Sequence, residues 1–306
     1  MLNLNKPAGV TSRDVVNVVQ RLAKPAKVGH AGTLDPMATG VLLVCVGQAT
    51  RLISLLQQPS KTYLAEFKFG QRSDTDDNTG TIEQSPPPQA TPSESRLREA
   101  LTSFVGLIEQ TPPAYSAVHV GGRRAYELAR KGKDVELAAR RVRVDLIELL
   151  NYEWPLATLR ISCGSGTYIR SIARDLGEML ECGALMSALQ RTRIGSFAVA
   201  DAIDPQTLSP ENLPANITPA IRIVDGIAAY VCTEEETECV AKGRVLELQK
   251  SRLTKASASE SAARDVDPAP PQVALLSPCG TQLLALGEIR RQGRKIQPRT
   301  VFATGQ

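Results

Sequence analysis

The sequence predicts an α+β protein built around a sheet. Strand-like and helix-like patterns alternate along the first two hundred residues, and they lack the regular strand–helix–strand rhythm of a parallel α/β fold. Of the 306 residues, 42% are hydrophobic and 22% are charged, which is typical of a globular chain rather than a disordered one. The length is sufficient for a sizeable core and favours two domains.

Three segments place apolar residues at helical spacing. They are residues 12–24, residues 93–105, which end before Gly106, and residues 169–180. Side chains that can accept hydrogen bonds from free backbone N–H groups stand at the start of the first and third segments. The predicted N-caps are Thr11 or Ser12 for the first helix and Thr167 for the third.

Five segments have the pattern of strands. Residues 61–69 alternate, with Tyr63, Ala65, Phe67 and Phe69 on one side. Residues 41–46 form a continuous apolar run of strand length, and residues 185–193 form a further strand. Residues 141–154 and 156–163 are two long strands, separated only by a break at Trp154-Pro155.

Composition excludes several classes of protein. The apolar run at residues 41–46 is far shorter than the roughly 18 residues that span a bilayer. The start of the chain lacks a basic stretch followed by an apolar one, so no signal peptide is expected. Six cysteines are scattered without a C-x-x-C pair and predict reduced thiols in the cytoplasm. With two histidines only, His30 and His119, no metal site is expected.

Two polar segments interrupt the helix and strand patterns of the chain. Residues 85–92 are rich in proline and predict a loop, whereas residues 251–271 are small and polar and predict a flexible excursion. The excursion separates an acidic stretch at residues 233–239 from a compact basic tail. We therefore predict two domains, residues 1–222 and residues 223–306, with the excursion inside the second. The basic residues of the tail are Arg290, Arg291, Arg294, Lys295 and Arg299.

The most unusual stretch is the loop at residues 29–40, GHAGTLDPMATG. Its three glycines predict tight turns or the close approach of a ligand, and Pro36 biases Asp35 towards an extended conformation. Such a loop can present Asp35 and His30 at the edge of a sheet, although capping of a turn is the more common role of an aspartate before proline. A nucleotide-binding loop is disfavoured, because the chain has neither a G-K-[ST] ending nor a G-x-G-x-x-G motif.

A second glycine turn, at residues 164–166, leads into the third predicted helix. Arg170 then falls in the first helical turn, where the helix dipole disfavours a cation by a few tenths of a kcal/mol up to about 1 kcal/mol. This placement indicates an acidic partner or a bound phosphate, or else an exposed arginine that tolerates the cost. The turn lacks the G-x-S-x-G motif of a serine hydrolase.

Positive charge is concentrated in residues 121–143. Eight lysines and arginines stand there against three acidic residues, a surplus that suits a phosphate backbone. A solvated helix with paired charges has the same composition. The basic residues are Arg123, Arg124, Arg130, Lys131, Lys133, Arg140, Arg141 and Arg143.

Together these segments resemble the TruB-type tRNA pseudouridine synthases, bacterial enzymes that isomerise uridine 55 in the TΨC arm. The most specific motifs are G-H-x-G-T-L-D-P and, later, G-T-Y-I-R-S, and a weaker resemblance to PUA-type RNA-binding domains covers residues 284–287 and 296–302. The resemblance implies the pseudouridine synthase fold, a mixed, mostly antiparallel sheet flanked by helices, with a small C-terminal β-rich PUA-like domain. The matching segments of the catalytic portion are residues 6–12, 29–40, 61–63, 73–80, 110–117 and 164–177.

The resemblance implies that Asp35 is the catalytic aspartate. The reaction breaks the N1–C1′ bond of uridine, turns the uracil and joins its C5 to C1′, and a carboxylate can serve it as nucleophile or base. Attack at C1′, attack at C6 and abstraction of a sugar proton all remain open. By the same resemblance Arg170 pairs with Asp35, and Tyr63 stacks on the base and assists the loss of the C5 proton.

The resemblance also assigns the surroundings of the base. Leu189 forms part of an apolar wall, Tyr168 is a further pocket residue, and His30 helps to displace the target from its stack. Lys6 and Pro7 support the loop structurally. His119 stands where the family usually has lysine, which puts one phosphate contact in doubt because an unperturbed histidine is mostly uncharged at neutral pH.

The implied partner is tRNA. A basic insertion at about residues 110–143 grips the RNA through Arg123, Arg124, Arg140, Arg141 and Arg143, and the terminal domain contacts the acceptor stem. No cofactor, metal, membrane or obligate protein partner is implied, and we expect a cytoplasmic monomer.

Two other functions use the same basic surface. One is a tRNA-folding chaperone in which catalysis is secondary, and the other is a related synthase that acts on another RNA within a protein complex. The intact set of Asp35, Tyr63 and Arg170 favours the enzyme, because a pure RNA binder has no use for that carboxylate. The chain's own terminal RNA-binding domain favours action without protein partners.

Overall fold

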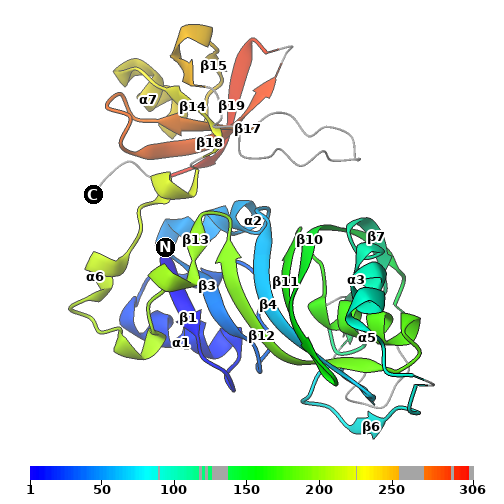
Figure 1. Ribbon diagram of the computed structural model, residues 1–306. Helices are drawn as coiled ribbons and strands as arrows, with labels where there is room; N and C mark the ends of the chain where they lie inside the picture. The colour runs from blue at the N-terminus through cyan, green and yellow to red at the C-terminus, as the bar shows by residue number, and fades with distance from the viewer. Residues whose placement is uncertain are drawn as a thin grey trace. The chain divides into compact units, whose positions relative to one another are not determined.

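The structure is a computed structural model, shown in Figure 1. It describes residues 1–88, 90–116, 119–120, 123–125, 137–224, 226–254, 272–290 and 293–302. The chain folds into two compact units. One unit contains Asn3–Val44 and Ser54–Glu211, and the other contains Met1–Leu2, Cys45–Ile53 and Asn212–Gln306. The predicted boundary at residues 222 and 223 remains a prediction.

A nine-stranded sheet forms the larger part of the fold, as expected for an α+β protein. Strand β12 pairs in parallel with β3 and antiparallel with β4, and the pairings from β4 onward to β7 are antiparallel. Two short strands, β2 (Val28–His30) and β13 (Phe197–Ala198), pair with β3 and β12 respectively. The main order is β1 (Leu2–Lys6), β3 (Thr39–Val46), β12 (Ala184–Ile194), β4 (Lys61–Phe69), β11 (Leu156–Cys163), β10 (Arg140–Glu153) and β7 (Gly106–Gln110).

The strand predictions are confirmed closely. Strand β4 buries Tyr63, Ala65, Phe67 and Phe69 on one face and leaves the alternate residues more exposed. Strands β10 and β11 form a hairpin that turns at Trp154-Pro155, and the run at residues 41–46 lies within β3. The common core beneath them joins β4, β10, β11 and β12 to two helices.

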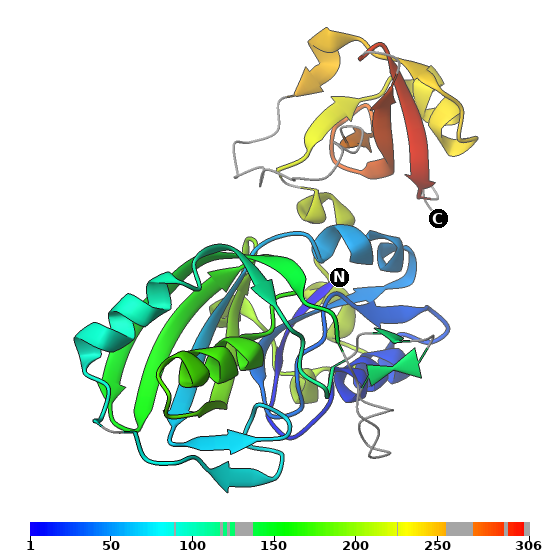
Figure 2. The same ribbon diagram turned by 90° about the vertical axis from the view of Figure 1, so that its right-hand side faces the viewer.

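The three predicted helices are present. Helix α1 (Ser12–Leu22) begins with a capping box, in which Thr11 Oγ1 accepts from the backbone N–H of Asp14 and the Asp14 carboxylate accepts from that of Thr11. Helix α3 (Glu94–Thr102) is capped by Ser93. Helices α3 and α5 (Ile169–Met179) pack against one another and cover the same face of the sheet (Figure 2).

The predicted cap of α5 is wrong. Tyr168, not Thr167, occupies the N-cap position, and no side chain caps the helix there. The Tyr168 backbone is instead bound by the side chain of Gln110, whose Oε1 accepts from Tyr168 N at 2.8 Å and whose Nε2 donates to Tyr168 O at 3.0 Å. The Thr167 hydroxyl donates to the Gly164 and Arg143 carbonyls. A distant glutamine thus holds the backbone of the N-cap residue, and it does not bind the N–H groups of the first helical turn as a hydroxyl cap would.

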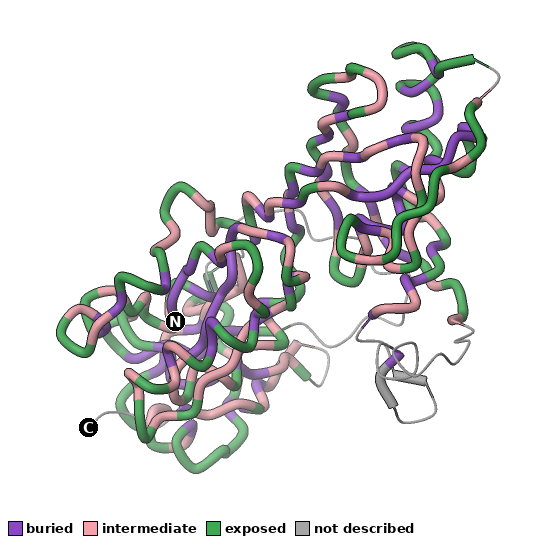
Figure 3. The backbone as a smooth tube through the Cα atoms, turned by 90° about the horizontal axis from the view of Figure 1, so that it is seen from below, coloured by how far each residue is buried: buried purple, intermediate pink, exposed green. Residues whose placement is uncertain are grey.

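The C-terminal unit contains a six-stranded sheet and one longer helix, α7 (Glu234–Ala241), which begins with a capping box of Thr233 and Glu236. Buried residues follow these strands. Figure 3 colours the backbone by burial for the residues that the structure describes. The predicted excursion falls largely on residues 255–271, which lie outside the described residues. The sheet order is β15 (Leu246–Glu247), β19 (Lys295–Val301), β18 (Leu283–Arg290), β17 (Gln272–Leu276), β14 (Ala228–Val231) and β16 (Leu253–Thr254).

The remaining elements are short. Two small hairpins pair β5 (Gln71–Ser73) with β6 (Ile82–Gln84) and β8 (His119–Val120) with β9 (Arg123–Arg124). None of the helices in the described part of the chain is long and apolar enough to cross a membrane. All six cysteines are free thiols. The other helical turns are η1 (Gly47–Leu52), α2 (Ile53–Leu56), η2 (Val199–Asp201), η3 (Pro205–Thr207), α6 (Leu213–Asn216), η4 (Ala220–Ile223) and η5 (Lys250–Arg252).

Candidate active site

The glycine loop at residues 29–40 connects β2 to β3 and carries Asp35. Lys6, which is fully buried, donates from Nζ to the carbonyls of Pro7 at 2.8 Å, Val10 at 2.7 Å and Pro36 at 3.1 Å. The Ser12 hydroxyl binds both the N–H and the carbonyl of Leu34. These contacts hold the backbone on both sides of Asp35, in agreement with the supporting role expected for Lys6.

Asp35 contacts Arg170 through both carboxylate oxygens. Arg170 Nη2 donates to Oδ1 at 3.1 Å, and Arg170 Nε lies 3.0 Å from Oδ2. The predicted pairing is therefore confirmed, and of the alternatives left open by the sequence the acidic partner is the one present. The two side chains differ in exposure, since Arg170 is 5% exposed and Asp35 is 31% exposed. A buried cation thus holds a carboxylate that is still accessible.

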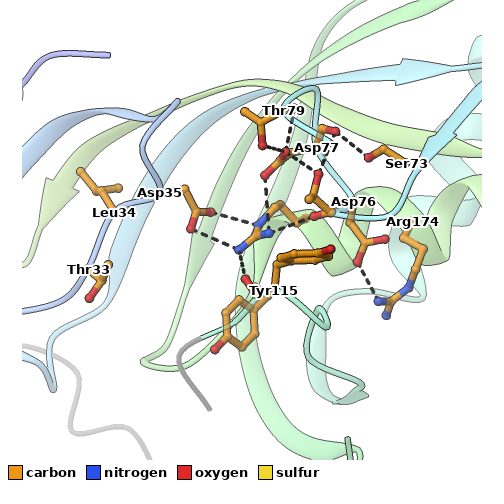
Figure 4. Close-up of polar contacts among 12 residues, drawn as sticks. Thr33, Leu34, Asp35, Ser73, Asp76, Asp77, Thr79, Tyr115 and Arg174 are labelled. Carbon is orange, nitrogen blue, oxygen red and sulfur yellow. Dashed lines mark hydrogen bonds and ion pairs between the residues drawn. The ribbon is translucent and has the colours of Figure 1, made fainter. Parts of the chain in front are cut away.

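Three further groups fix the Arg170 guanidinium (Figure 4). Nη1 donates to the Thr75 carbonyl at 2.9 Å and lies 3.5 Å from Asp77 Oδ2, and Nη2 also donates to the Tyr115 carbonyl at 3.2 Å. Asp77 is itself buried, and its Oδ1 accepts from the hydroxyls of Thr75 and Thr79 and from the Thr79 N–H. Arg170 is thereby held in place by partners other than Asp35.

The surroundings of Asp35 act on its charge in opposite directions. Burial raises the pKa of the Asp35 carboxyl above its ordinary value, and the negative charge of Asp77 acts in the same direction. The positive charges of Arg170 and, to a smaller extent, Lys6 lower the same pKa. The ionised form of Asp35 therefore depends on Arg170.

The segment that carries Asp77 is anchored to the sheet and to α5. Asp76 has a left-handed backbone with φ of 59°, and its carbonyl accepts from Met186 N of β12. Its carboxylate lies 2.9 Å from Arg174 Nη1, and Arg174 also binds Asp175 and the Thr111 carbonyl. Arg174, one turn after Arg170 on α5, thus binds the segment that holds Thr75 and the segment that holds Tyr115, and both of these segments also contact Arg170.

Asp76 is expected to make the stability of the protein depend on pH. Burial raises the pKa of its carboxyl from 3.8 to about 6, against the opposing charge of Arg174. Because the folded state holds this proton more tightly than the unfolded state, its contribution is largest below pH 4 and is lost as the pH rises to 6. The change amounts to about 3 kcal/mol, at 1.36 kcal/mol per pKa unit.

Urea unfolding of the wild-type protein and of Asp76→Asn between pH 4 and pH 7 measures this effect. We expect the free energy of unfolding of the wild type, relative to that of Asp76→Asn, to fall across this range. A difference that stays constant with pH contradicts the assignment.

Two predicted pocket residues lie in the core beneath the loop. Tyr63 on β4 and Leu189 on β12 are 9% and 8% exposed and belong to the same apolar cluster as Leu34. Burial raises the pKa of the Tyr63 hydroxyl, and the charge of Asp35 adds to this increase. His30, at the end of β2, is half-buried, and burial lowers its pKa, which favours the neutral imidazole.

Tyr168 lies next to the predicted basic surface. The Arg140 guanidinium is stacked over its ring at 4.9 Å from the centroid and also donates to the Gly166 carbonyl. On the same strand, Arg143 is paired with Asp145 at 2.6 Å, whereas Arg141 is exposed. Arg140 and Arg143 therefore have partners within the protein, and Arg141 presents its side chain to solvent.

The rest of the basic segment is described only in part. Arg123 and Arg124 form β9, which pairs with β8, so that Arg124 lies opposite His119 and Arg123 opposite Val120. Arg130, Lys131 and Lys133, which were also predicted to belong to the basic surface, lie outside the described residues. An RNA-binding role of this segment therefore stays a prediction.

Nothing in the local sequence pattern singles out Asp76, Asp77, Arg174 or Gln110. Each acts on a partner far away in the chain, which local pattern cannot show. The density of acids in the stretch at residues 73–80, SDTDDNTG, could have pointed to Asp76 and Asp77, and the resemblance to the family covers residues 73–80, 110–117 and 164–177, which hold all four residues. Among the described residues, no group of three or more His, Cys, Asp or Glu side chains could hold a metal ion.

Comparison with known proteins agrees with this geometry. Residues 20–169 match the model of the TruB family pseudouridylate synthase N-terminal domain, and residues 170–216 match the tRNA pseudouridylate synthase B C-terminal domain. The chain is 38% identical over 310 residues to tRNA pseudouridine synthase B of Syntrophomonas wolfei subsp. wolfei, covering 98% of this chain and 97% of that one. It is 40% identical over 243 residues to the protein of that name from Clostridium kluyveri, covering 79% and 83% of the two chains.

Solved structures show the same fold. A chain in a Cbf5-Nop10-Gar1 complex superposes with a TM-score of 0.73 at 25% identity, over 99% of this chain and 84% of that one. A chain from an H/ACA RNP bound to a substrate RNA containing 2′-deoxyuridine gives a TM-score of 0.70 at 24% identity, over the same shares of the two chains. The expected pseudouridine synthase fold is confirmed. With its family model, its full-length relatives and this fold in agreement, the chain belongs to the TruB family of pseudouridylate synthases, which are isomerases.

Proposed function

We propose that this protein converts uridine 55 in the TΨC arm of tRNA to pseudouridine, with Asp35 as the single catalytic carboxylate acting on a flipped-out uridine. The observation that carries the proposal is the unequal burial of the central ion pair. Complete burial of both partners costs desolvation free energy that the attraction between them need not recover, and here only one partner is enclosed, since Arg170 is 5% exposed and Asp35 is 31% exposed. The partly exposed side chain of Asp35 is available to a substrate.

The reaction requires an ionised carboxylate in a site that retains the free base. The N1–C1′ bond breaks, the uracil turns, the C5–C1′ bond forms, and the proton on C5 is lost while N1 gains one. Asp35 serves as nucleophile or base in this sequence. No atoms are added to the RNA and none is oxidised or reduced, so the chemistry calls for no redox cofactor.

The remaining residues surround the base. Tyr63 stacks on the uracil and takes part in the final removal of the C5 proton, and Leu189 forms the apolar wall that excludes water. His30, favoured in its neutral form, fills the place that the flipped uridine leaves in the RNA stack. Tyr168 lines the pocket next to Arg140.

The RNA is bound by strand β10, by the rest of the basic insertion at about residues 110–143, which includes Arg123 and Arg124, and by the C-terminal sheet. That sheet, with the basic residues of the β18–β19 hairpin, serves as a PUA-like domain on the acceptor stem. The enzyme acts in the cytoplasm as a monomer without an obligate protein partner.

Replacing Arg140, Arg141 and Arg143 together by glutamine is expected to weaken RNA binding and to flatten its salt dependence. Each phosphate that the variant no longer binds reduces the slope of log K against log salt by about 0.7–0.9. Because Arg140 and Arg143 already have partners, we expect Arg141→Gln alone to account for much of the change. Fluorescence anisotropy with a labelled TΨC stem-loop measures the slope.

The matched control is Arg160→Gln on β11, an equally basic, half-exposed side chain paired with Glu148. We expect it to leave the slope unchanged. A triple variant with the wild-type slope argues against an RNA contact on β10.

Release of the C5 hydrogen tests the proposed reaction. A TΨC stem-loop carrying tritium at C5 of the target uridine is expected to release it into water with purified protein, in step with pseudouridine formation measured by mass spectrometry. A stem-loop labelled at a paired uridine is the control and should release none. If the target position keeps its tritium, the proposed activity is wrong.

A further inference from the structure

Arg191 is a buried arginine that the proposed reaction does not use. It lies on β12 and is 2% exposed. It forms no ion pair with a carboxylate among the residues that the structure describes. Burial of a charge without a counter-ion costs free energy, which hydrogen bonds to the charged group must offset.

The Arg191 guanidinium binds both ends of the Asp35 loop. Nε donates to the Val41 carbonyl at 2.8 Å, Nη2 to the Gly32 carbonyl at 3.1 Å and Nη1 to the Thr33 carbonyl at 3.4 Å. All three oxygens belong to residues that flank Asp35. The planar guanidinium fork of arginine donates from three separate nitrogen atoms and so spans the two ends of the loop, whereas a lysine ammonium donates from a single nitrogen.

The backbone of Arg191 fixes the other side of the site. In the sheet register it is paired with Tyr63 of β4 and with Gly40 of β3, the strand that leaves the Asp35 loop. The approach at Gly40 is so close that a Cβ there would lie 2.2 Å from the Arg191 carbonyl oxygen. Gly40 also has φ of 101°, which favours glycine.

We propose that Arg191 is a positioning residue, which sets Tyr63 and the Asp35 loop at a fixed separation by pairing with both flanking strands and binding the loop carbonyls. The inference rests on the proposed function, because it assigns Asp35 and Tyr63 to the reaction. Arg191 itself does not touch the substrate.

The positive charge of Arg191 also shifts the pKa values of Tyr63 and Lys61. Its positive charge lowers the pKa of the Tyr63 hydroxyl, which burial raises by a larger amount. Burial and then Arg191 lower the pKa of the neighbouring Lys61 to about 8. A fixed cation near Tyr63 stabilises its tyrosinate form, which is the form of this side chain that can accept the C5 proton.

The test compares Arg191→Gln and Arg191→Lys with the wild type by single-turnover pseudouridine formation at saturating stem-loop, together with the Kd for the RNA. We expect Arg191→Gln to lower the rate by about 10²-fold, the effect of displacing reacting groups by about 1 Å, with an unchanged Kd. Arg191→Lys keeps the charge without the fork and is expected to restore part of the rate.

The matched control is Arg252→Gln in the C-terminal unit, where Arg252 is a partly buried arginine bound to both carboxylate oxygens of Glu236. It is expected to lower the melting temperature without lowering the single-turnover rate. A wild-type rate in Arg191→Gln overturns the inference. If Arg191→Gln fails to fold, a wild-type rate in Arg191→Lys overturns it instead. Equal rate losses in Arg191→Gln and Arg252→Gln also overturn it.

Asp35→Asn in the same assay separates this inference from the proposed function. If Asp35→Asn retains the rate, the proposed function fails whatever the Arg191 variants do. If Asp35→Asn is inactive while both Arg191 variants keep the wild-type rate, only the inference about Arg191 fails.

Discussion

Replacing Asp35 by asparagine is expected to abolish pseudouridine formation in a TΨC stem-loop. The amide has nearly the same shape and can still accept a hydrogen bond from Arg170, but it is neither a nucleophile nor a base. Since we propose that the basic surfaces, and not Asp35, hold the RNA as a whole, we expect the Kd to stay within about tenfold, or about 1.4 kcal/mol. Single-turnover assays and a binding titration on the same preparation measure both quantities.

A surface variant with the same chemical change, Asp201→Asn, controls for the substitution itself and is expected to keep full activity. The same pair of variants separates the enzyme from a tRNA-folding chaperone. A chaperone retains its folding activity in Asp35→Asn, because RNA binding is preserved. Isomerisation by purified Asp35→Asn at the wild-type rate contradicts the role given to this carboxylate.

Replacing Arg170 by glutamine is expected to have the second largest effect, a loss of at least about 10²-fold in the chemical rate. It removes both contacts to Asp35 and the anchors at Thr75 and Tyr115. It also leaves Asp77, which is 4% exposed, without its ion pair, so the free energy of unfolding should fall by about 3–5 kcal/mol. The rate must therefore be compared below the melting temperature of the variant.

The pH dependence of the rate distinguishes a defect in the chemical step from a defect in stability. The reaction we propose needs ionised Asp35, burial already raises the pKa of this group, and Arg170 opposes that rise. Without Arg170 the pKa rises further, so the acid limb of the rate profile should move to higher pH. Arg170→Lys keeps the charge and should shift the limb less than Arg170→Gln. An acid limb at the same pH in all three proteins contradicts this electrostatic role.

Much of the local structure followed from the sequence. Alternation at residues 61–69 predicted β4 and its buried face, and Thr11 was one of the two N-caps predicted for α1. These features are local, because periodicity and capping depend on neighbours within a few residues. The pairing of Asp35 with Arg170 was expected from the resemblance to the family, since no local pattern joins two residues so far apart.

The long-range contacts could not be predicted in this way. Thr167 looked like the cap of α5, but the Gln110 side chain, 58 residues from Tyr168, binds the backbone there. Arg191 looked like one polar position in a strand, and only the sheet register places it between Gly40 and Tyr63. In each case an interaction across the sheet or from another loop decided the role of the side chain.

The most direct test of the central claim is to map pseudouridine at single-nucleotide resolution in unmodified tRNA after incubation with the purified protein and with Asp35→Asn. We predict modification at uridine 55 with the wild-type protein and none at that position with the variant. Modification at other positions only, or equal modification of uridine 55 by both proteins, would contradict the account.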